Sequence, residues 1–86
     1  MNNFCKTKQV SYYRNFARQN GNAVVCYPQK SGVCFKVAFY KNANFLKVSI
    51  ENSFKKPLII ENSDVLTDEV LRIIINSFFK RALKAD

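Results

Sequence analysis

The side chains best suited to binding chemistry lie in two segments, residues 33–40 and 45–51, which alternate strictly between apolar and mixed positions. This is the pattern of strands that are buried on one face. If residues 41–44 form the loop between them, the buried side pairs Phe39 with Leu46, Val37 with Val48, and Phe35 with Ile50. The outer side then carries Lys36, Tyr40, Phe45 and Lys47, with Tyr40 across from Phe45. Bases stack on aromatic rings and lysines neutralise phosphates, so this face is suited to single-stranded nucleic acid.

The same aromatic pair has a purely structural interpretation. Cross-strand aromatic pairs stabilise sheets by about 0.2–1 kcal/mol without any ligand. Tyr40 and Phe45 could equally be covered by another subunit. The pattern alone leaves these alternatives open.

Residues for catalysis and for metal binding are scarce. The chain has no histidine, which removes Ser-His and Cys-His nucleophile pairs, and its two glycines cannot build a phosphate-binding loop. Cys5, Cys26 and Cys34 lack C-x-x-C spacing, which argues against a zinc site. We interpret Cys26 and Cys34 as small buried strand residues in a reducing compartment, with a disulfide between them as the alternative. We expect no enzyme activity, no catalytic residue, no metal and no cofactor.

Charge is distributed unevenly along the chain. The formal net charge is +8, and residues 1–50 contain no acid. The basic residues of this half are Lys6, Lys8, Arg14, Arg18, Lys30, Lys36, Lys41 and Lys47. This asymmetry favours a polyanionic partner, although charge can also serve solubility alone. The candidate nucleic-acid-binding residues are Arg14, Arg18, Lys30, Lys36, Tyr40, Lys41, Phe45 and Lys47.

Length and composition predict one domain, residues 1–86, with a modest core. A hydrophobic fraction of 48% is ample for a folded globule. No window approaches the roughly 18 apolar residues of a membrane span, and the first residues lack the apolar core of a signal peptide. We therefore expect no membrane association and an intracellular location, in the cytoplasm or in the nucleoid or nucleus.

The first helix is expected from about Lys8 to Asn20, after a loose basic arm at residues 1–6. Thr7 would cap this helix and Gly21 would end it. Its buried stripe consists of Val10, Tyr13, Phe16 and Ala17, with Ser11, Arg14 and Arg18 on the far side. Arg14 and Arg18 are one turn apart and repel each other unless something negative lies across them.

Two further short segments read as strands. Residues 22–27 form a β-rich run ended by Pro28, and residues 28–32 form a turn with Gly32 at a positive φ. Residues 58–60 form a brief fourth strand behind Pro57, and residues 61–66 a loop.

A long helix begins after Thr67, with acids in its first turn and basic residues in its last turns. Its apolar face consists of Leu71, Ile74, Ile75, Phe78, Ala82 and Leu83, flanked by Val70, Ile73 and Phe79. Arg72, Asn76, Ser77, Lys80 and Arg81 are expected outside. Because this apolar face is wide, Ile73 and Phe79 either fill an intramolecular groove or meet a second chain in a homodimer. The fold class is α+β, a small antiparallel sheet of three to four strands with an N-terminal helix and a long C-terminal helix packed on one face.

Residues 35–50, FKVAFYKNANFLKVSI, then KKPLII, a loop and the helix after Thr67, resemble a PUR repeat or the related PC4-like module. The resemblance covers about residues 33–83. It implies a β-β-β-β-α unit that dimerises and binds single-stranded DNA or RNA on its curved sheet, with Lys36, Tyr40, Phe45 and Lys47 as binding residues. The turn departs from the family, since Lys41-Asn42-Ala43-Asn44 replaces the usual glycine or arginine, and residues 22–27 must supply the first strand.

SYYRNFARQNG is similar to the first helix of a double-stranded RNA-binding domain, and the order of elements fits as well. The second helix of that family opens with a lysine- and alanine-rich segment. Here LTDEVLRII opens with two acids and has no alanine, so the residues that would hold the phosphates are absent. We rank this resemblance lower.

A function of a different class also fits the composition. A compact basic chain without catalytic residues is suited to be a small inhibitor, encoded by a virus or mobile element, that docks on a host protein or nucleoprotein complex. The expected partners are thus nucleic acid, single-stranded by preference, with a host protein as the alternative.

Overall fold

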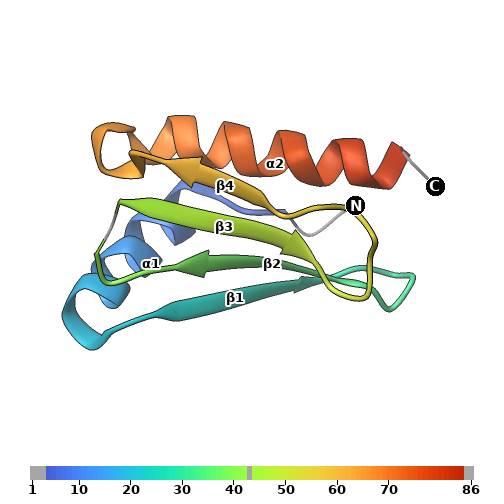
Figure 1. Ribbon diagram of the computed structural model, residues 1–86, viewed down its shortest axis with the longest axis horizontal. Helices are drawn as coiled ribbons and strands as arrows, with labels where there is room; N and C mark the ends of the chain where they lie inside the picture. Colours follow the sequence, from blue (N-terminus) through green and yellow to red (C-terminus); the bar gives the residue numbers. More distant parts are fainter. Residues whose placement is uncertain (1–3, 43, 85–86) are drawn as a thin grey trace.

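The computed structural model describes residues 4–42 and 44–84 of the chain. The elements run in the order α1 (Thr7–Asn20), β1 (Ala23–Pro28), β2 (Cys34–Phe39), β3 (Phe45–Ile50), β4 (Leu58–Glu61), η1 (Ser63–Val65, a 3-10 helix) and α2 (Asp68–Lys84) (Figure 1). This is the predicted α+β class, and the sheet has four strands.

The sheet is an antiparallel meander in which each strand pairs with its neighbour in sequence, in the order β1-β2-β3-β4. The predicted register of the central hairpin is confirmed: Phe35 pairs with Ile50, Val37 with Val48, and Phe39 with Leu46. Alternation fixes this register because a slip by one residue would turn every apolar side chain outward. The predicted loop at residues 41–44 includes Ala43, which lies outside the described residues.

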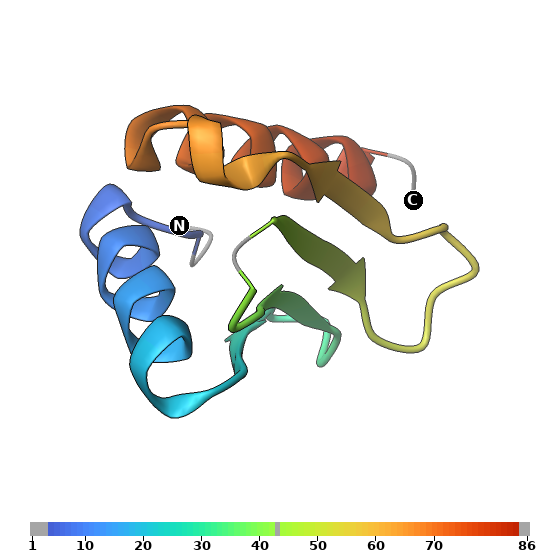
Figure 2. The same cartoon turned by 60° about the vertical axis from the view of Figure 1, so that its left-hand side comes forward.

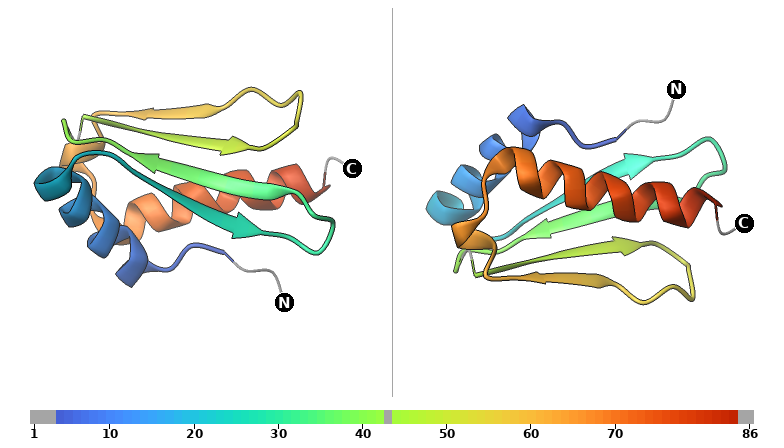
Figure 3. Two further views of the ribbon diagram at one scale, coloured as in Figure 1. Left: turned by 90° about the horizontal axis from the view of Figure 1, so that it is seen from below. Right: turned by 90° about the horizontal axis from the view of Figure 1, so that it is seen from above.

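Both helices cover the same face of the sheet, as predicted (Figures 2 and 3). β2 is one of the two inner strands of the sheet. It contributes Phe35, Val37 and Phe39 to the hydrophobic core, and each is at most 3% exposed. The ring of Phe79 stacks on Phe35 with 4.7 Å between centroids, and Phe79 is fully buried. The suggestion that Phe79 meets a second chain is therefore wrong: this side chain lies at the centre of the core.

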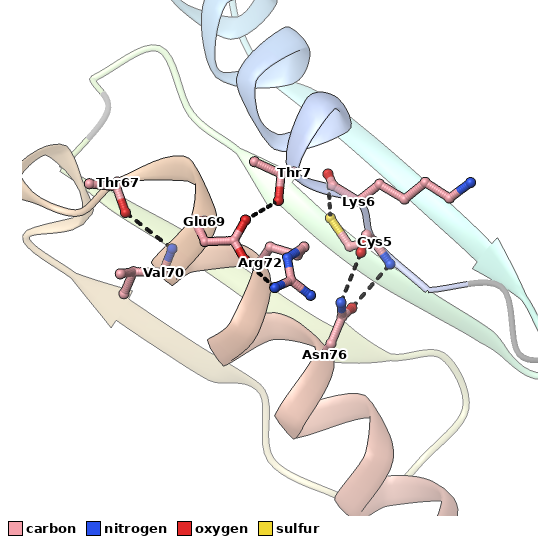
Figure 4. Close-up of polar contacts among 8 residues, drawn as sticks. All are labelled: Cys5, Lys6, Thr7, Thr67, Glu69, Val70, Arg72 and Asn76. Atoms are coloured by element: carbon pink, nitrogen blue, oxygen red, sulfur yellow. Dashed lines mark hydrogen bonds and ion pairs between the residues drawn. The ribbon is translucent and has the colours of Figure 1, made fainter.

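The start of α1 differs from the prediction. Thr7 is the first helical residue and Lys6 is the cap, with the Lys6 N–H donating to Gln9 Oε1 at 3.1 Å. The Thr7 hydroxyl donates instead to Glu69 Oε2 on α2, at 2.6 Å (Figure 4). Because α2 offers a carboxylate, this hydroxyl links two helices rather than capping one. The end of α1 is as predicted, since Gly21 has φ +100° and its N–H donates to the Ala17 carbonyl.

The segment before α1 is not a loose arm over the part that the structure describes, residues 4–6. Cys5 is 3% exposed, its N–H donates to Asn76 Oδ1 at 3.0 Å, and Asn76 Nδ2 donates to the Cys5 carbonyl at 2.8 Å (Figure 4). The Phe4 ring lies 6.0 Å from that of Phe79. Asn76 was expected outside, but it is buried because this segment packs over it and uses both ends of its amide.

Two other expectations for the helices need correction, and one is confirmed. Phe16 is 40% exposed and lies beside Tyr12 rather than in the core. The predicted loop at residues 61–66 contains η1, entered through Asn62 at φ +55°. The Thr67 cap is confirmed, because the Val70 N–H donates to Thr67 Oγ1 at 3.2 Å.

Candidate nucleic-acid interface

The face of the sheet opposite the helices carries the outward-pointing side chains of all four strands. The strand register sets them in rows, and the central row is Val24, Ala38, Lys47 and Ile59. Val24 is 61% exposed and Ile59 47% exposed. These two residues are not among the binding residues predicted from the sequence, although the alternation that buries Tyr27 and Ile60 already implies that Val24 and Ile59 point outward.

The predicted pairing of Tyr40 with Phe45 is present at one end of this face. The two rings are stacked, with centroids 4.6 Å apart and an interplanar angle of 27°. Phe45 is 37% exposed and Tyr40 is half-buried. Beside Phe45 is a hollow of about 470 Å³, lined by Asn44, Phe45, Ile59, Glu61 and Asn62. Its volume falls within the roughly 300–1,000 Å³ of ligand pockets.

The two lysines of this face differ in their surroundings. Lys36 Nζ lies 3.5 Å from Glu51 Oε1, in a pair that is partly exposed to solvent. Lys47 is exposed and, among the described residues, forms no ion pair. Of the two lysines, Lys47 is therefore the one without an ion-pair partner among the described residues.

The structure does not bring all eight predicted residues together. Lys36, Tyr40, Phe45 and Lys47 share the uncovered face. Lys30 and Lys41 are exposed in the turns before and after β2, at opposite ends of the sheet. The remaining two, Arg14 and Arg18, are on α1, which covers the other face.

Arg14 is held inside the molecule. Its guanidinium donates to Asp68 Oδ1 at 2.8 Å, to the Leu66 carbonyl at 3.0 Å and to the Ser63 carbonyl at 3.1 Å. The side chain is 12% exposed. For Arg14, the expected negative group is thus Asp68 of the same chain. Arg14 joins α1 to the start of α2, whereas Arg18 remains exposed.

The cysteines also differ from expectation. Cys26 is exposed and Cys34 is half-buried, both on the uncovered face, and only Cys5 is fully buried. The expectation of buried strand cysteines is wrong for Cys26, because Val25 and Tyr27 take the core side of β1 and turn Cys26 outward.

Over residues 4–42 and 44–84, no group of three or more potential metal ligands is found. Within the same residues, no helix is long and apolar enough to cross a membrane. The fold is that of a small α+β protein whose four-stranded sheet is covered by helices on one face and uncovered on the other. Comparison with protein-family models, with curated proteins and with solved structures finds no match for this chain.

Proposed function

We propose that this protein binds single-stranded nucleic acid on the uncovered face of its sheet and carries out no catalysis. The observation that supports this proposal most directly is the partly exposed stack of Tyr40 and Phe45, on the same face as Lys47. Bases stack on such rings with little regard to sequence, and a free cation nearby neutralises the backbone. The hollow beside Phe45 gives space for an unstacked base. A duplex offers no exposed base faces, so it is the weaker ligand.

A second candidate is docking of a protein partner on the same face, as in a small inhibitor from a virus or mobile element. The specific observation in its favour is the pair of exposed aliphatic side chains, Val24 and Ile59, at the two ends of the central row. Aliphatic groups contribute to a protein interface by burial, whereas they offer a base less than an aromatic ring does. Glu51 and Glu61 on the same side also reduce its positive charge.

The test is a titration of the purified chain against labelled 20-nucleotide single strands and the matching duplex, followed by fluorescence anisotropy at low salt. Stacking contributes about 1–3 kcal/mol per base. Tyr40→Ala and Phe45→Ala should therefore each weaken single-strand binding by roughly 5- to 150-fold. Light scattering on the same samples tests homodimerisation, for which α2 still offers exposed Val70 and Ile73.

Tyr12→Ala is the matched control, because Tyr12 is a 59% exposed tyrosine on α1, away from the uncovered face. It should leave affinity unchanged. If micromolar protein leaves the single strand tumbling freely, nucleic-acid binding is excluded and the protein-docking candidate takes its place. If the aromatic variants lose folding together with binding, the two rings belong to the core and the proposed site is wrong.

A further inference from the structure

Cys26 and Cys34 are neighbours on the uncovered face of the sheet. In the ladder between β1 and β2, Cys26 pairs with Lys36 and Pro28 pairs with Cys34. Residues two positions apart in a strand point to the same side, so the two cysteines are diagonal neighbours across the ladder. The register therefore brings together two thiols that are eight positions apart in sequence.

Burial raises the pKa of Cys34, and the neighbouring Cys26 thiol raises it further, as expected for two thiols that lie close together. Diagonal Cα atoms are typically about 7–8 Å apart, slightly beyond the roughly 4.4–6.8 Å of disulfides. Closing a disulfide therefore requires a small movement of the backbone at this end of the ladder. Cys34 belongs to the last pair of the ladder, and its carbonyl accepts a hydrogen bond from the Glu51 N–H on the other side. β1, which carries Cys26, is an edge strand that pairs on one side only, so it is the strand that moves.

The two thiols are not equivalent. Cys26 is exposed, so it is the thiol that a reagent in solution reaches first. Cys34 is half-buried, and desolvation, the Cys26 thiol and the Glu51 carboxylate raise its pKa. Cys26 therefore acts as the attacking thiol and Cys34 as the resolving thiol.

We propose that Cys26 and Cys34 form an oxidation site that closes to an intramolecular disulfide at the expense of a low-molecular-weight disulfide such as oxidised glutathione. The Cys26 thiolate attacks one sulfur of that disulfide, whose S–S bond breaks, and a first small thiolate leaves. The Cys34 thiolate then attacks Cys26 Sγ, the mixed disulfide breaks, and a second small thiolate leaves. The protein loses two electrons and two protons, and the small disulfide is reduced to two thiols.

Cys5 provides an internal reference for this reaction. It is 3% exposed and lies on the helix side of the sheet, where burial raises its pKa. Its backbone is held by Asn76. A buried thiol of this kind is unreactive, so it should stay reduced while the pair on the other face oxidises.

The test incubates the full chain with oxidised glutathione at mildly alkaline pH. It is followed by thiol titration under denaturing conditions and by peptide mass spectrometry. The wild-type chain should fall from three free thiols to one, lose two hydrogen atoms in mass, and yield a peptide cross-linked between Cys26 and Cys34. Reduction with dithiothreitol should restore all three thiols.

Serine variants separate the two roles, and circular dichroism checks that each variant is folded. Cys34→Ser should accumulate glutathione on Cys26, because no resolving thiol remains. Cys26→Ser should keep both remaining thiols free. A wild-type chain that keeps three free thiols, that stops at the glutathione adduct, or that cross-links two chains instead would overturn the proposal. These outcomes do not depend on nucleic-acid binding.

Discussion

Asn76 is the residue whose role differs most from its expected one. It is a polar side chain on α2, 8% exposed, and it satisfies both the N–H and the carbonyl of Cys5. Buried backbone groups need partners, and this segment finds them in one amide rather than in a strand or helix. The amide thus fixes the segment before α1 against the last helix.

Replacing Asn76 with Ala should destabilise the protein by about 1–3 kcal/mol, because the Cys5 N–H and carbonyl would stay buried without partners. Urea unfolding followed by circular dichroism measures this loss. Ser77→Ala on the next position is the matched control, since Ser77 is exposed, and it should change stability by no more than about 0.5 kcal/mol. Equal effects of the two variants would mean that the Asn76 hydrogen bonds contribute nothing beyond helix propensity.

At the scale of elements, α1 and α2 are joined by polar contacts at the edge of their apolar interface. Glu69 on α2 accepts hydrogen bonds from Arg72 of the same helix and from Thr7 of α1. These two donors lower the pKa of Glu69, in that order of importance. A carboxyl whose pKa is lower in the folded state stabilises the fold above its unfolded pKa.

This contribution is fully present at neutral pH and is lost as the pH falls from about 5, through the unfolded pKa near 4.3, to the lower folded pKa. Thermal unfolding of wild type and Glu69→Gln from pH 7 to pH 3 should give melting curves that converge as the solution becomes acidic. Asp64→Asn removes an exposed carboxylate in η1 that forms no ion pair among the described residues, and it is the matched control for the loss of one negative charge. A constant difference between Glu69→Gln and wild type at every pH would contradict the assignment.

The elements show which parts of the fold the sequence could predict. The hairpin register followed from strict alternation and one loop length, and with it the contact of Tyr40 and Phe45. The rotation of α2 was harder to predict, because its apolar face packs against two neighbours: Phe79 stacks on Phe35 of the sheet and also lies beside Phe4 of the N-terminal segment. An apolar helix face of that width does not show which residue lies at its centre, so the pattern placed Phe79 at the flank.

The candidate site was predictable only where it depends on local spacing. The outward positions of Lys36 and Lys47 follow from the two-residue period of a strand. The outward positions of Val24 and Ile59 could have been predicted in the same way. Arg14 did not, because its partners Leu66 and Asp68 are 52 and 54 positions away. Helical periodicity gives the side of α1 on which Arg14 lies, but not the element that packs there.

At the scale of the whole molecule, the acid-free first half is not a single basic patch. Lys8 and Arg18 are exposed on α1, Lys30 and Lys41 lie at opposite ends of the sheet, and Lys47 lies on the uncovered face. The positive charge therefore surrounds the molecule, and the contribution of each cation to binding depends on its position. Arg14 adds little, since Asp68 neutralises it.

The salt dependence of the proposed nucleic-acid binding distinguishes phosphate contacts on the uncovered face from a general attraction to the net positive charge. Each phosphate contact with a single strand contributes about −0.7 to the slope of log K against log salt. Lys47→Gln should therefore reduce the steepness of the slope by about 0.7. Lys8→Gln, which removes the same charge from the opposite side of the molecule, should leave it unchanged. Equal reductions in both variants would mean that binding follows net charge and that the sheet face has no special part in it.

The position of Phe79 in the core also matters for how the chain is made. The four strands pair only with neighbours in sequence, so the meander can form as soon as residues 23–61 have emerged from the ribosome. α1 precedes the sheet and covers the part of its inner face around Phe39, whereas the part around Phe35 is covered only when α2 follows. For that interval the nascent sheet exposes a continuous apolar surface, which is the kind of surface that chaperones bind and that leads to aggregation when synthesis stalls. A truncated chain that ends between residues 61 and 79 would therefore be more aggregation-prone than one that ends before β2.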